Sequence, residues 1–159
     1  MTQRHPIQND EPLLVTTVVK DREHVFSNNA FAREAVEALY RTQDRYPFFL
    51  YGFVIMPDHV HILLKAISPM KVSLIMNRYK TCVSRCIGIG PLWQRRFHIK
   101  TIQDGSPVLD YIHNNPCVKG LSEIPEEYPW SSASGKWDIS PLDVLIAAIR
   151  FTHSFSVEA

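Results

Sequence analysis

Residues 53–64 constrain the fold more than any other stretch of this chain. Two apolar runs of strand composition flank Pro57-Asp58, a dipeptide that favours a turn, so we expect two adjacent antiparallel strands. Side chains alternate faces along a strand, so His59 and His61 point the same way while Val60 points the other way. Paired imidazoles of this kind form half of a site for a divalent cation. Two surface histidines on an amphipathic strand are the alternative.

Apolar periodicity along the rest of the chain predicts an α+β sandwich. Strand-like runs cover residues 13–19, 48–56, 59–66 and 92–103, and helical patterns run from a Ser27 cap to about Arg45, from Ser68-Pro69 to Gly88, and onward from Ser106-Pro107. This order favours a mostly antiparallel sheet covered by helices on one side. We expect one domain over residues 1–159, with residues 133–159 as a C-terminal extension of unclear role that includes a short helix at 141–151.

Composition is that of an ordinary globular domain, with 45% hydrophobic and 21% charged residues. No apolar run approaches the roughly 18 residues of a membrane span, and the N-terminus lacks the apolar core of a signal peptide. The 3 cysteines are odd in number and lack paired zinc-type spacing. These features predict a cytoplasmic protein with reduced thiols and no membrane partner.

Charge is strongly segregated along the chain. No Asp or Glu occurs between His59 and Gln103, a window that holds 8 of the 17 basic residues, so the rest of the chain carries 9 basic against 16 acidic residues. Lys71, Arg78 and Arg85 recur every seven residues and therefore line one flank of the second helix. One positive surface on an otherwise acidic body is the electrostatic footprint expected for binding a polyanion.

Two polar residues of the third helix share a face, because Tyr111 and Asn115 stand four residues apart. A tyrosine there can offer its hydroxyl to a cleft, and an asparagine one turn away can offer an amide oxygen to a cation. Pro116 disfavours helical geometry at Asn115, which places this residue at the helix end. Taken alone, a helical tyrosine is usually core and an asparagine before proline is usually a cap or turn.

Taken together, the motifs of this chain resemble the single-tyrosine HUH transposases, and most closely the REP-associated branch of the insertion-sequence transposases. The motifs that carry the resemblance, in chain order, are Met56-Pro-Asp-His-Val-His-Ile-Leu-Leu, Leu92-Trp-Gln-Arg-Arg-Phe, Tyr111-Ile-His-Asn-Asn-Pro and Tyr128-Pro-Trp-Ser-Ser. The resemblance runs from about Leu13 to Ser132. It implies a ferredoxin-like (RRM-like) α+β domain that cleaves and rejoins single-stranded DNA at hairpin-forming ends.

The resemblance also implies site residues. His59 and His61 match the metal ligands, Tyr111 the nucleophile, and Asn115 the polar residue that completes the metal site. A DNA-facing strand corresponds to Trp93, Gln94, Arg95 and Arg96, and the basic run adds Lys71, Arg78, Arg85 and Lys100 as candidate DNA-binding residues. Some family members carry Asn in place of Asp58, and an acidic neighbour can raise cation affinity. Many relatives dimerise while REP-associated members can act as monomers, which leaves a homodimer possible.

The implied chemistry fits these residue types. Attack of the Tyr111 hydroxyl on a backbone phosphorus gives a 5′-phosphotyrosine and a free 3′-hydroxyl. A free tyrosine has a pKa of about 10, so its hydroxyl needs help to act as a nucleophile. A cation held by His59, His61 and Asn115 would polarise the phosphate, and this ligand set suits Mn²⁺ or the more abundant Mg²⁺.

Two other functions share these motifs. A domesticated protein could bind DNA hairpins without cutting, but intact His59, His61, Tyr111 and Asn115 argue against it. A replication or conjugation nickase of the same chemistry usually has a larger body, and Tyr128-Pro-Trp-Ser-Ser disfavours it.

Charge segregation generates a prediction about salt. If the basic flank meets phosphates, affinity for single-stranded DNA falls steeply with salt concentration, with a log–log slope of roughly −0.7 per contact. Neutralising Arg78 and Arg85 together should flatten that slope by about one unit or more. Fluorescence anisotropy across a salt series measures it. An unchanged slope in the double variant would mean that DNA lies elsewhere.

Overall fold

The computed structural model describes residues 11–102 and 105–141, and its centre is a four-stranded antiparallel sheet. The strands are β1 (Leu13–Val18), β2 (Phe48–Ile55), β3 (His59–Ala66) and β4 (His98–Thr101), and they lie in the order β2-β3-β1-β4. The predicted hairpin at Pro57-Asp58 joins β2 to β3, with the Met56 N–H donating to the His59 carbonyl at 2.8 Å.

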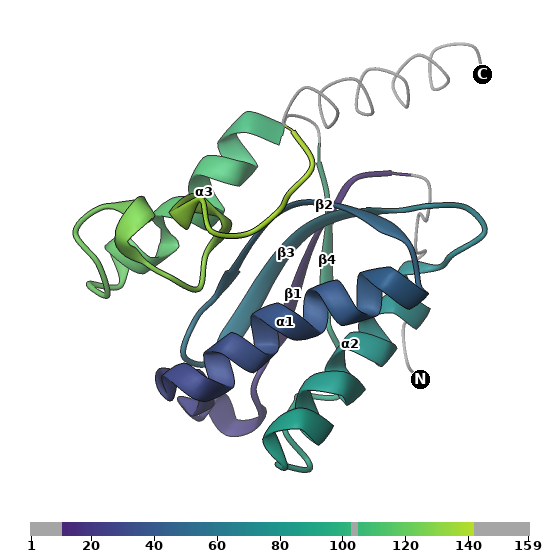
Figure 1. Cartoon of the computed structure of the whole chain (residues 1–159), viewed down its shortest axis with the longest axis horizontal. Coiled ribbons are helices and arrows are strands. Elements are labelled where there is room, and N and C mark those ends of the chain that lie inside the picture. The colour runs from purple at the N-terminus through teal and green to yellow at the C-terminus, as the bar shows by residue number, and fades with distance from the viewer. Residues whose placement is uncertain (1–10, 103–104, 142–159) are drawn as a thin grey trace.

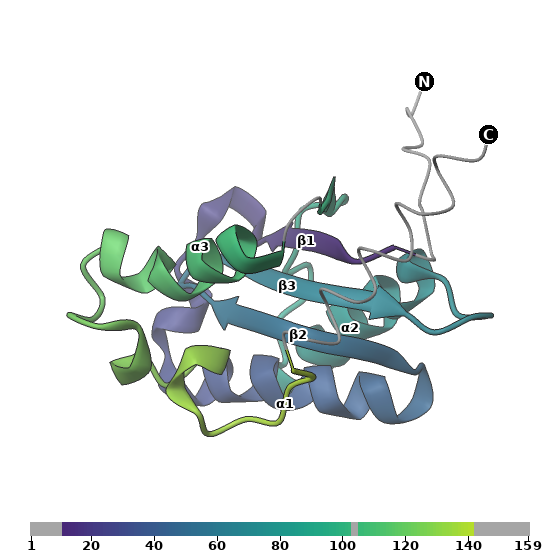
Figure 2. The same cartoon turned by 90° about the horizontal axis from the view of Figure 1, so that it is seen from above.

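Three helices pack on this sheet: α1 (Asn29–Arg45), α2 (Val72–Ile87) and α3 (Gly105–Val118). Helices α1 and α2 lie side by side across one face, and α3 lies on the other (Figures 1 and 2). The order β1-α1-β2-β3-α2-β4 and the antiparallel sheet confirm the predicted ferredoxin-like α+β fold. The partial cover that α3 gives to the second face was not indicated by the sequence pattern. Short 3-10 turns complete the chain at Lys20–Arg22, Val25–Ser27, Pro125–Glu127 and Ser132–Ser134.

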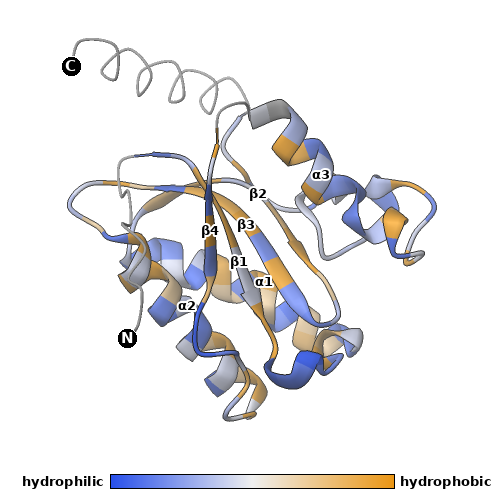
Figure 3. Ribbon diagram, turned by 180° about the vertical axis from the view of Figure 1, so that it is seen from behind, coloured by the Kyte–Doolittle hydropathy of each residue, from blue (hydrophilic) through white to orange (hydrophobic). Residues whose placement is uncertain are grey.

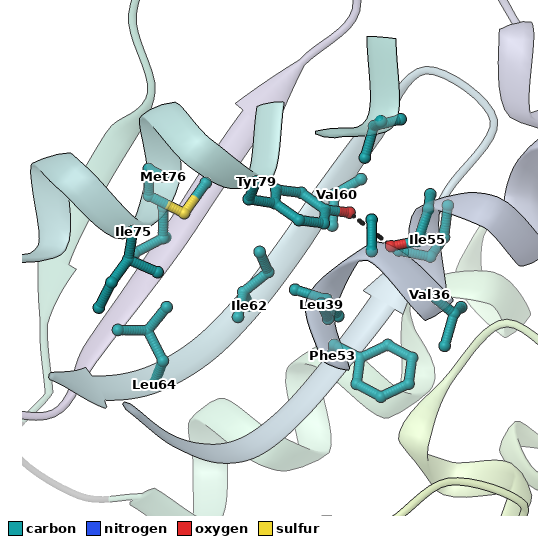
Figure 4. Close-up of a cluster of buried hydrophobic side chains, with 14 of the residues drawn as sticks. Val36, Leu39, Phe53, Ile55, Val60, Ile62, Leu64, Ile75, Met76 and Tyr79 are labelled. Atoms are coloured by element: carbon teal, nitrogen blue, oxygen red, sulfur yellow. Dashed lines mark hydrogen bonds between the residues drawn. The ribbon is translucent and has the colours of Figure 1, made fainter. Parts of the chain in front are cut away.

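The larger core lies between the sheet and the α1/α2 layer. Val60, Ile62 and Leu64 of β3 are fully buried there, as the alternation along this strand predicts. Tyr79 of α2 is also fully buried, and its hydroxyl donates to the Ala35 carbonyl of α1 at 2.9 Å (Figure 4). This hydrogen bond joins the two helices through an otherwise apolar interior.

A smaller core lies on the opposite face, beneath α3. It contains Leu14, Leu63 and Val54 from three neighbouring strands, together with Ile112 of α3 and Tyr128. A bulge in β2 between Leu50 and Gly52 shifts its register against β3. Gly52 allows α3 to approach closely, because a Cβ built there would lie 2.5 Å from Cδ1 of Leu109.

Several predicted boundaries were wrong, for identifiable reasons. The N-cap of α1 is Asn28 rather than Ser27, since its side chain accepts from the Ala30 and Phe31 N–H groups at 2.9 and 3.4 Å. Helix α2 begins at Val72, after Ser68-Pro69, because the chain first turns through a Met70 N–H to Ile67 carbonyl bond of 2.9 Å.

The fourth strand is shorter than the predicted run of residues 92–103, and the third helix is longer. Trp93 bridges only to Val19 and packs its ring against Phe26, so regular pairing is confined to His98–Thr101. Helix α3 continues through Pro116 to Val118, so Asn115 lies within it rather than at its end.

The first part of the predicted C-terminal extension packs against α1. Trp137 stacks on Tyr40 with ring centroids 6.3 Å apart, and the Tyr40 hydroxyl donates to the Asp138 carbonyl at 2.6 Å. The predicted helix at 141–151 lies almost wholly outside the described residues. Within the described part of the chain, no helix has the length and apolar character needed to cross a membrane.

Candidate active site

His59 and His61 project from β3 on the face opposite the larger core. Their ring centroids are 4.7 Å apart and the ring planes are 78° to each other. His61 is 6% exposed, so it lies deep in the site, and His59 is half-buried at the start of the strand. From this side, hydrophilic bands alternate with hydrophobic ones along β3, and β4 carries a hydrophilic stretch (Figure 3). The structure therefore places the two imidazoles side by side, as their spacing predicts.

Hydrogen bonds at Nδ1 orient both rings. Nδ1 of His59 lies 2.6 Å from Oδ1 of Asp58, and Nδ1 of His61 lies 2.8 Å from Oγ1 of Thr16 on β1. Nη1 of Arg22 holds the other Asp58 oxygen at 3.1 Å. A carboxylate can only accept, so His59 donates through Nδ1 and its Nε2 is left to act as a ligand.

Burial and charge set the protonation of these groups. Partial burial alone would raise the pKa of Asp58, but the partners His59 and Arg22 outweigh it and lower that pKa, so the carboxyl is ionised. Burial, reinforced by the nearby His59, lowers the pKa of His61 to about 4. His61 is therefore neutral at physiological pH, and neutral imidazole is the form that binds metal ions.

Helix α3 brings Tyr111 to the histidine pair. The Tyr111 ring centroid lies 5.6 Å from that of His61, in an edge-on arrangement, and the side chain is 56% exposed. Exposure of so large a ring leaves its hydroxyl accessible to a ligand. Asn115 is one turn further along the same helix and 7% exposed. The predicted nucleophile and both predicted histidine ligands thus lie together, with Asn115 on the helix that carries the tyrosine.

The Tyr128-Pro-Trp-Ser-Ser motif connects α3 to the edge strand β2 through hydrogen bonds. Oγ of Ser132 lies 2.8 Å from Nε2 of His113 on α3, and it accepts the Phe53 N–H of β2 at 3.0 Å. The Tyr128 hydroxyl donates to the Ile55 carbonyl at 2.6 Å. Sequence reasoning gave His113 no role. His113 stands two residues after Tyr111, so it lies on roughly the opposite side of the helix. This spacing could have indicated that one of the two side chains is exposed and the other packs inward.

Burial favours the neutral form of the His113 ring. Burial lowers its pKa, although the negative charges of Asp110 and Glu126 act in the opposite direction. A neutral ring can serve as one partner of the Ser132 hydroxyl without placing a charge beside the smaller core.

These residues fit a divalent cation. Among the described residues, no group of three or more His, Cys, Asp and Glu is placed to hold a metal ion. A site built on His59 and His61 would therefore need a different oxygen ligand, and the candidate is the amide of Asn115, which is nearly buried one turn after Tyr111 on α3. Two imidazoles oriented by hydrogen bonds at Nδ1, with an amide oxygen, form a donor set suited to Mn²⁺ or Mg²⁺.

A cleft of about 440 Å³ opens next to the Tyr111 and His61 side chains. It lies between β1, β4 and the first turns of α3. Lys100, a predicted DNA-binding residue, lines this cleft together with His98, which the sequence analysis did not select.

The other predicted DNA-binding residues lie elsewhere. Arg78 and Arg85 line a groove of about 370 Å³ between α2 and the end of α1, and the Arg78 guanidinium sits 5.7 Å from the Tyr46 ring centroid. This groove belongs to the α1/α2 layer, and that layer lies on the opposite side of the sheet from α3, the helix that carries Tyr111 (Figure 2). Lys71 is exposed at the start of α2.

The predicted DNA-facing strand is mostly irregular. Trp93 packs on Phe26 and Tyr79, with centroid separations of 5.6 and 6.4 Å, and donates its Nε1–H to the Lys80 carbonyl at 3.0 Å. Its position in the larger core favours a structural role. The Gln94 carbonyl accepts from Nζ of Lys80, whereas Arg95 and Arg96 are exposed.

Comparisons with known proteins agree on one family. Residues 13–115 match the model of a protein family described as "Transposase IS200 like". A protein of Haemophilus influenzae named as a REP-associated tyrosine transposase is 30% identical over 138 residues, which cover 74% of this chain and 76% of that protein.

Solved structures share the fold. A REP-associated tyrosine transposase bound to a REP hairpin superposes with a TM-score of 0.74 at 19% identity, over 90% of each chain. A protein of Deinococcus radiodurans described as a transposase gives a TM-score of 0.53 at 15% identity, over 76% of this chain and 98% of that chain.

The Asp58–His59 contact generates a prediction about metal binding. Asp58→Ala should weaken Mn²⁺ binding by about 10- to 100-fold, because the carboxylate orients His59 and increases its basicity. Asp58→Asn keeps an acceptor for Nδ1–H and should lose less. Isothermal titration calorimetry measures both affinities. Equal affinities in wild type and the Asp58→Ala protein would contradict the assigned role of Asp58.

Proposed function

The chain belongs to the IS200-like transposase family, and we propose that it cleaves and rejoins single-stranded DNA through a tyrosine–phosphate intermediate. The observation that carries this proposal is the position of an exposed Tyr111 ring 5.6 Å from His61, beside a second histidine. A hydroxyl nucleophile next to two imidazoles able to bind a metal ion is an arrangement suited to phosphoryl transfer.

In the proposed cleavage step, the Tyr111 oxygen attacks a backbone phosphorus. The new bond joins the tyrosine oxygen to phosphorus, and the bond from phosphorus to the 3′-oxygen breaks. The tyrosine loses its proton to solvent, and the departing 3′-oxygen takes one up to become a hydroxyl. Since one phosphoester replaces another, attack of a 3′-hydroxyl on the phosphotyrosine rejoins strands without ATP.

The other site residues support this step. Nε2 of His59, Nε2 of His61 and the Asn115 amide oxygen would hold Mg²⁺ or Mn²⁺, and the cation would polarise the scissile phosphate and stabilise its developing charge. Asp58 and Thr16 orient the two imidazoles. The Ser132–His113 contact keeps α3, and with it Tyr111, at a fixed distance from β2.

We also propose that the substrate forms a hairpin. One structural neighbour is a REP-associated tyrosine transposase bound to a REP hairpin. In this chain the α1–α2 groove offers a phosphate-binding surface, because Arg45, Arg78 and Arg85 line it and form no ion pair with any described residue. Arg41 also lines the groove but is paired with Glu34 and Glu37.

Tyr111→Phe should abolish cleavage and leave hairpin binding nearly unchanged, since it removes only the attacking hydroxyl. The readout is the covalent protein–DNA adduct on a denaturing gel, with DNA flanking the protein's own gene as substrate. Melting temperature serves as the folding control, because the side chain is exposed. Adduct formation by the Phe variant would identify another nucleophile. Hairpin binding by a wild type that forms no adduct would indicate a binding protein.

His59→Ala and His61→Ala should each remove cleavage, and a chelator should remove it from wild type. The physical reason is loss of the donor set that holds the cation beside Tyr111. His24→Ala is a matched control, because His24 is exposed and outside the site. Undiminished adduct formation in saturating EDTA would rule out metal dependence.

A further inference from the structure

The cleft beside Tyr111 has a shape and lining that the cleavage step does not use. Its volume of about 440 Å³ lies within the usual range for small-molecule sites. Leu14 of β1 and Pro107 and Val108 of α3 give it an apolar lining. Such a surface suits a flat ring better than a phosphate or a sugar, which both prefer polar partners.

Basic side chains border this apolar surface. In the β1–β4 pairing, Leu14 is opposite Lys100 and Thr16 is opposite His98. Paired residues point to the same face of a sheet, so Lys100 and His98 lie on the face that carries His61. Both are exposed, and none of the described residues that line the cleft is acidic. The cleft therefore combines an apolar wall with a positively charged edge.

We propose that this cleft binds the base of a nucleotide next to the scissile phosphate, and that Lys100 contacts a backbone phosphate of the same strand. The inference rests on the proposed function, because Tyr111 must face a phosphate. A base and its phosphate are joined by a single sugar, so any strand whose phosphate reaches Tyr111 carries a base to within one sugar of it. The cleft is the space that Tyr111 and His61 border.

The assignment makes the cleft a determinant of sequence preference at the cleavage position. Apolar contact with a base is tolerant of sequence, whereas His98 at the edge can distinguish bases through a hydrogen bond. The α1–α2 groove, by contrast, is lined by four arginines, Arg41, Arg45, Arg78 and Arg85, and so offers guanidinium groups to phosphates. The two surfaces are therefore expected to bind different parts of the DNA.

Methyl NMR on the full chain tests the proposal without requiring cleavage. The probes are the four deoxynucleoside 5′-monophosphates, with deoxyribose 5-phosphate as the probe that lacks a base. Nucleotides should shift the methyl signals of Leu14 and Val108, and deoxyribose 5-phosphate should bind at least about 5-fold more weakly. Equal binding of the base-free probe, or shifts confined to the α1–α2 groove, would overturn the proposal.

Variants sharpen the test. Lys100→Ala should weaken nucleotide binding by about 2- to 5-fold, the range of an exposed ion pair, while Lys136→Ala at another exposed site should not. Unchanged affinity in the Lys100→Ala protein would overturn the assigned phosphate contact. Adduct formation by wild type separates this inference from the proposed function: nucleotide binding without adduct rejects cleavage alone, and adduct without methyl shifts rejects the base site alone.

Discussion

The alternation of side chains along β3 is the constraint on which the structure depends. Val60, Ile62 and Leu64 fill the larger core, while His59 and His61 face the opposite side. A slip of one residue would bury both imidazoles among aliphatic side chains. It would also remove Val60, Ile62 and Leu64 from the larger core, where the burial of each side chain contributes about 1.5–3 kcal/mol. The register of β3 therefore positions the histidine pair as firmly as it holds the core. It also sets His61 opposite Thr16, whose hydroxyl orients the ring.

Local pattern was sufficient for the central elements of this fold. The hairpin at Pro57-Asp58, the shared face of His59 and His61, and the helix that carries Tyr111 all follow from periodicity and turn chemistry. Features that depend on distant contacts could not be read in this way. Trp93 leaves the predicted strand because its ring packs against Phe26 and Tyr79 in a partly buried position. The face chosen by α3 depends on close approach at Gly52 and on Ser132, far away in sequence.

The acid-free basic run shows that the distribution of charge over the folded surface also cannot be read from the order of residues in the sequence. Its residues are contiguous in sequence, but folding places Arg78 and Arg85 on the helical layer and Lys100 on the face with Tyr111. The sheet and the larger core separate the two sets. A charge pattern along a chain therefore predicts that a polyanion binds, whereas the division of that charge between surfaces is a property of the fold. In the proposed function, this division lets the helical layer hold a hairpin while the opposite face acts on a single strand.

The hydrogen bonds that hold α3 against the sheet have a consequence for the order in which the site is completed during protein synthesis. The two histidines and the fully buried residues of the larger core precede α3 in the chain. The hydrogen bonds that hold this helix region against β2 come from Tyr128 and Ser132, which follow it. The ribosome therefore synthesises the histidine pair before Tyr111, and Tyr111 before the residues that hold α3 in place, Tyr128 and Ser132. A nascent chain that ends before residue 105 contains every fully buried residue of the larger core but lacks Tyr111, the proposed nucleophile. In the proposed function, a newly made molecule would therefore be able to attack DNA only after the segment with Tyr128 and Ser132 has been added.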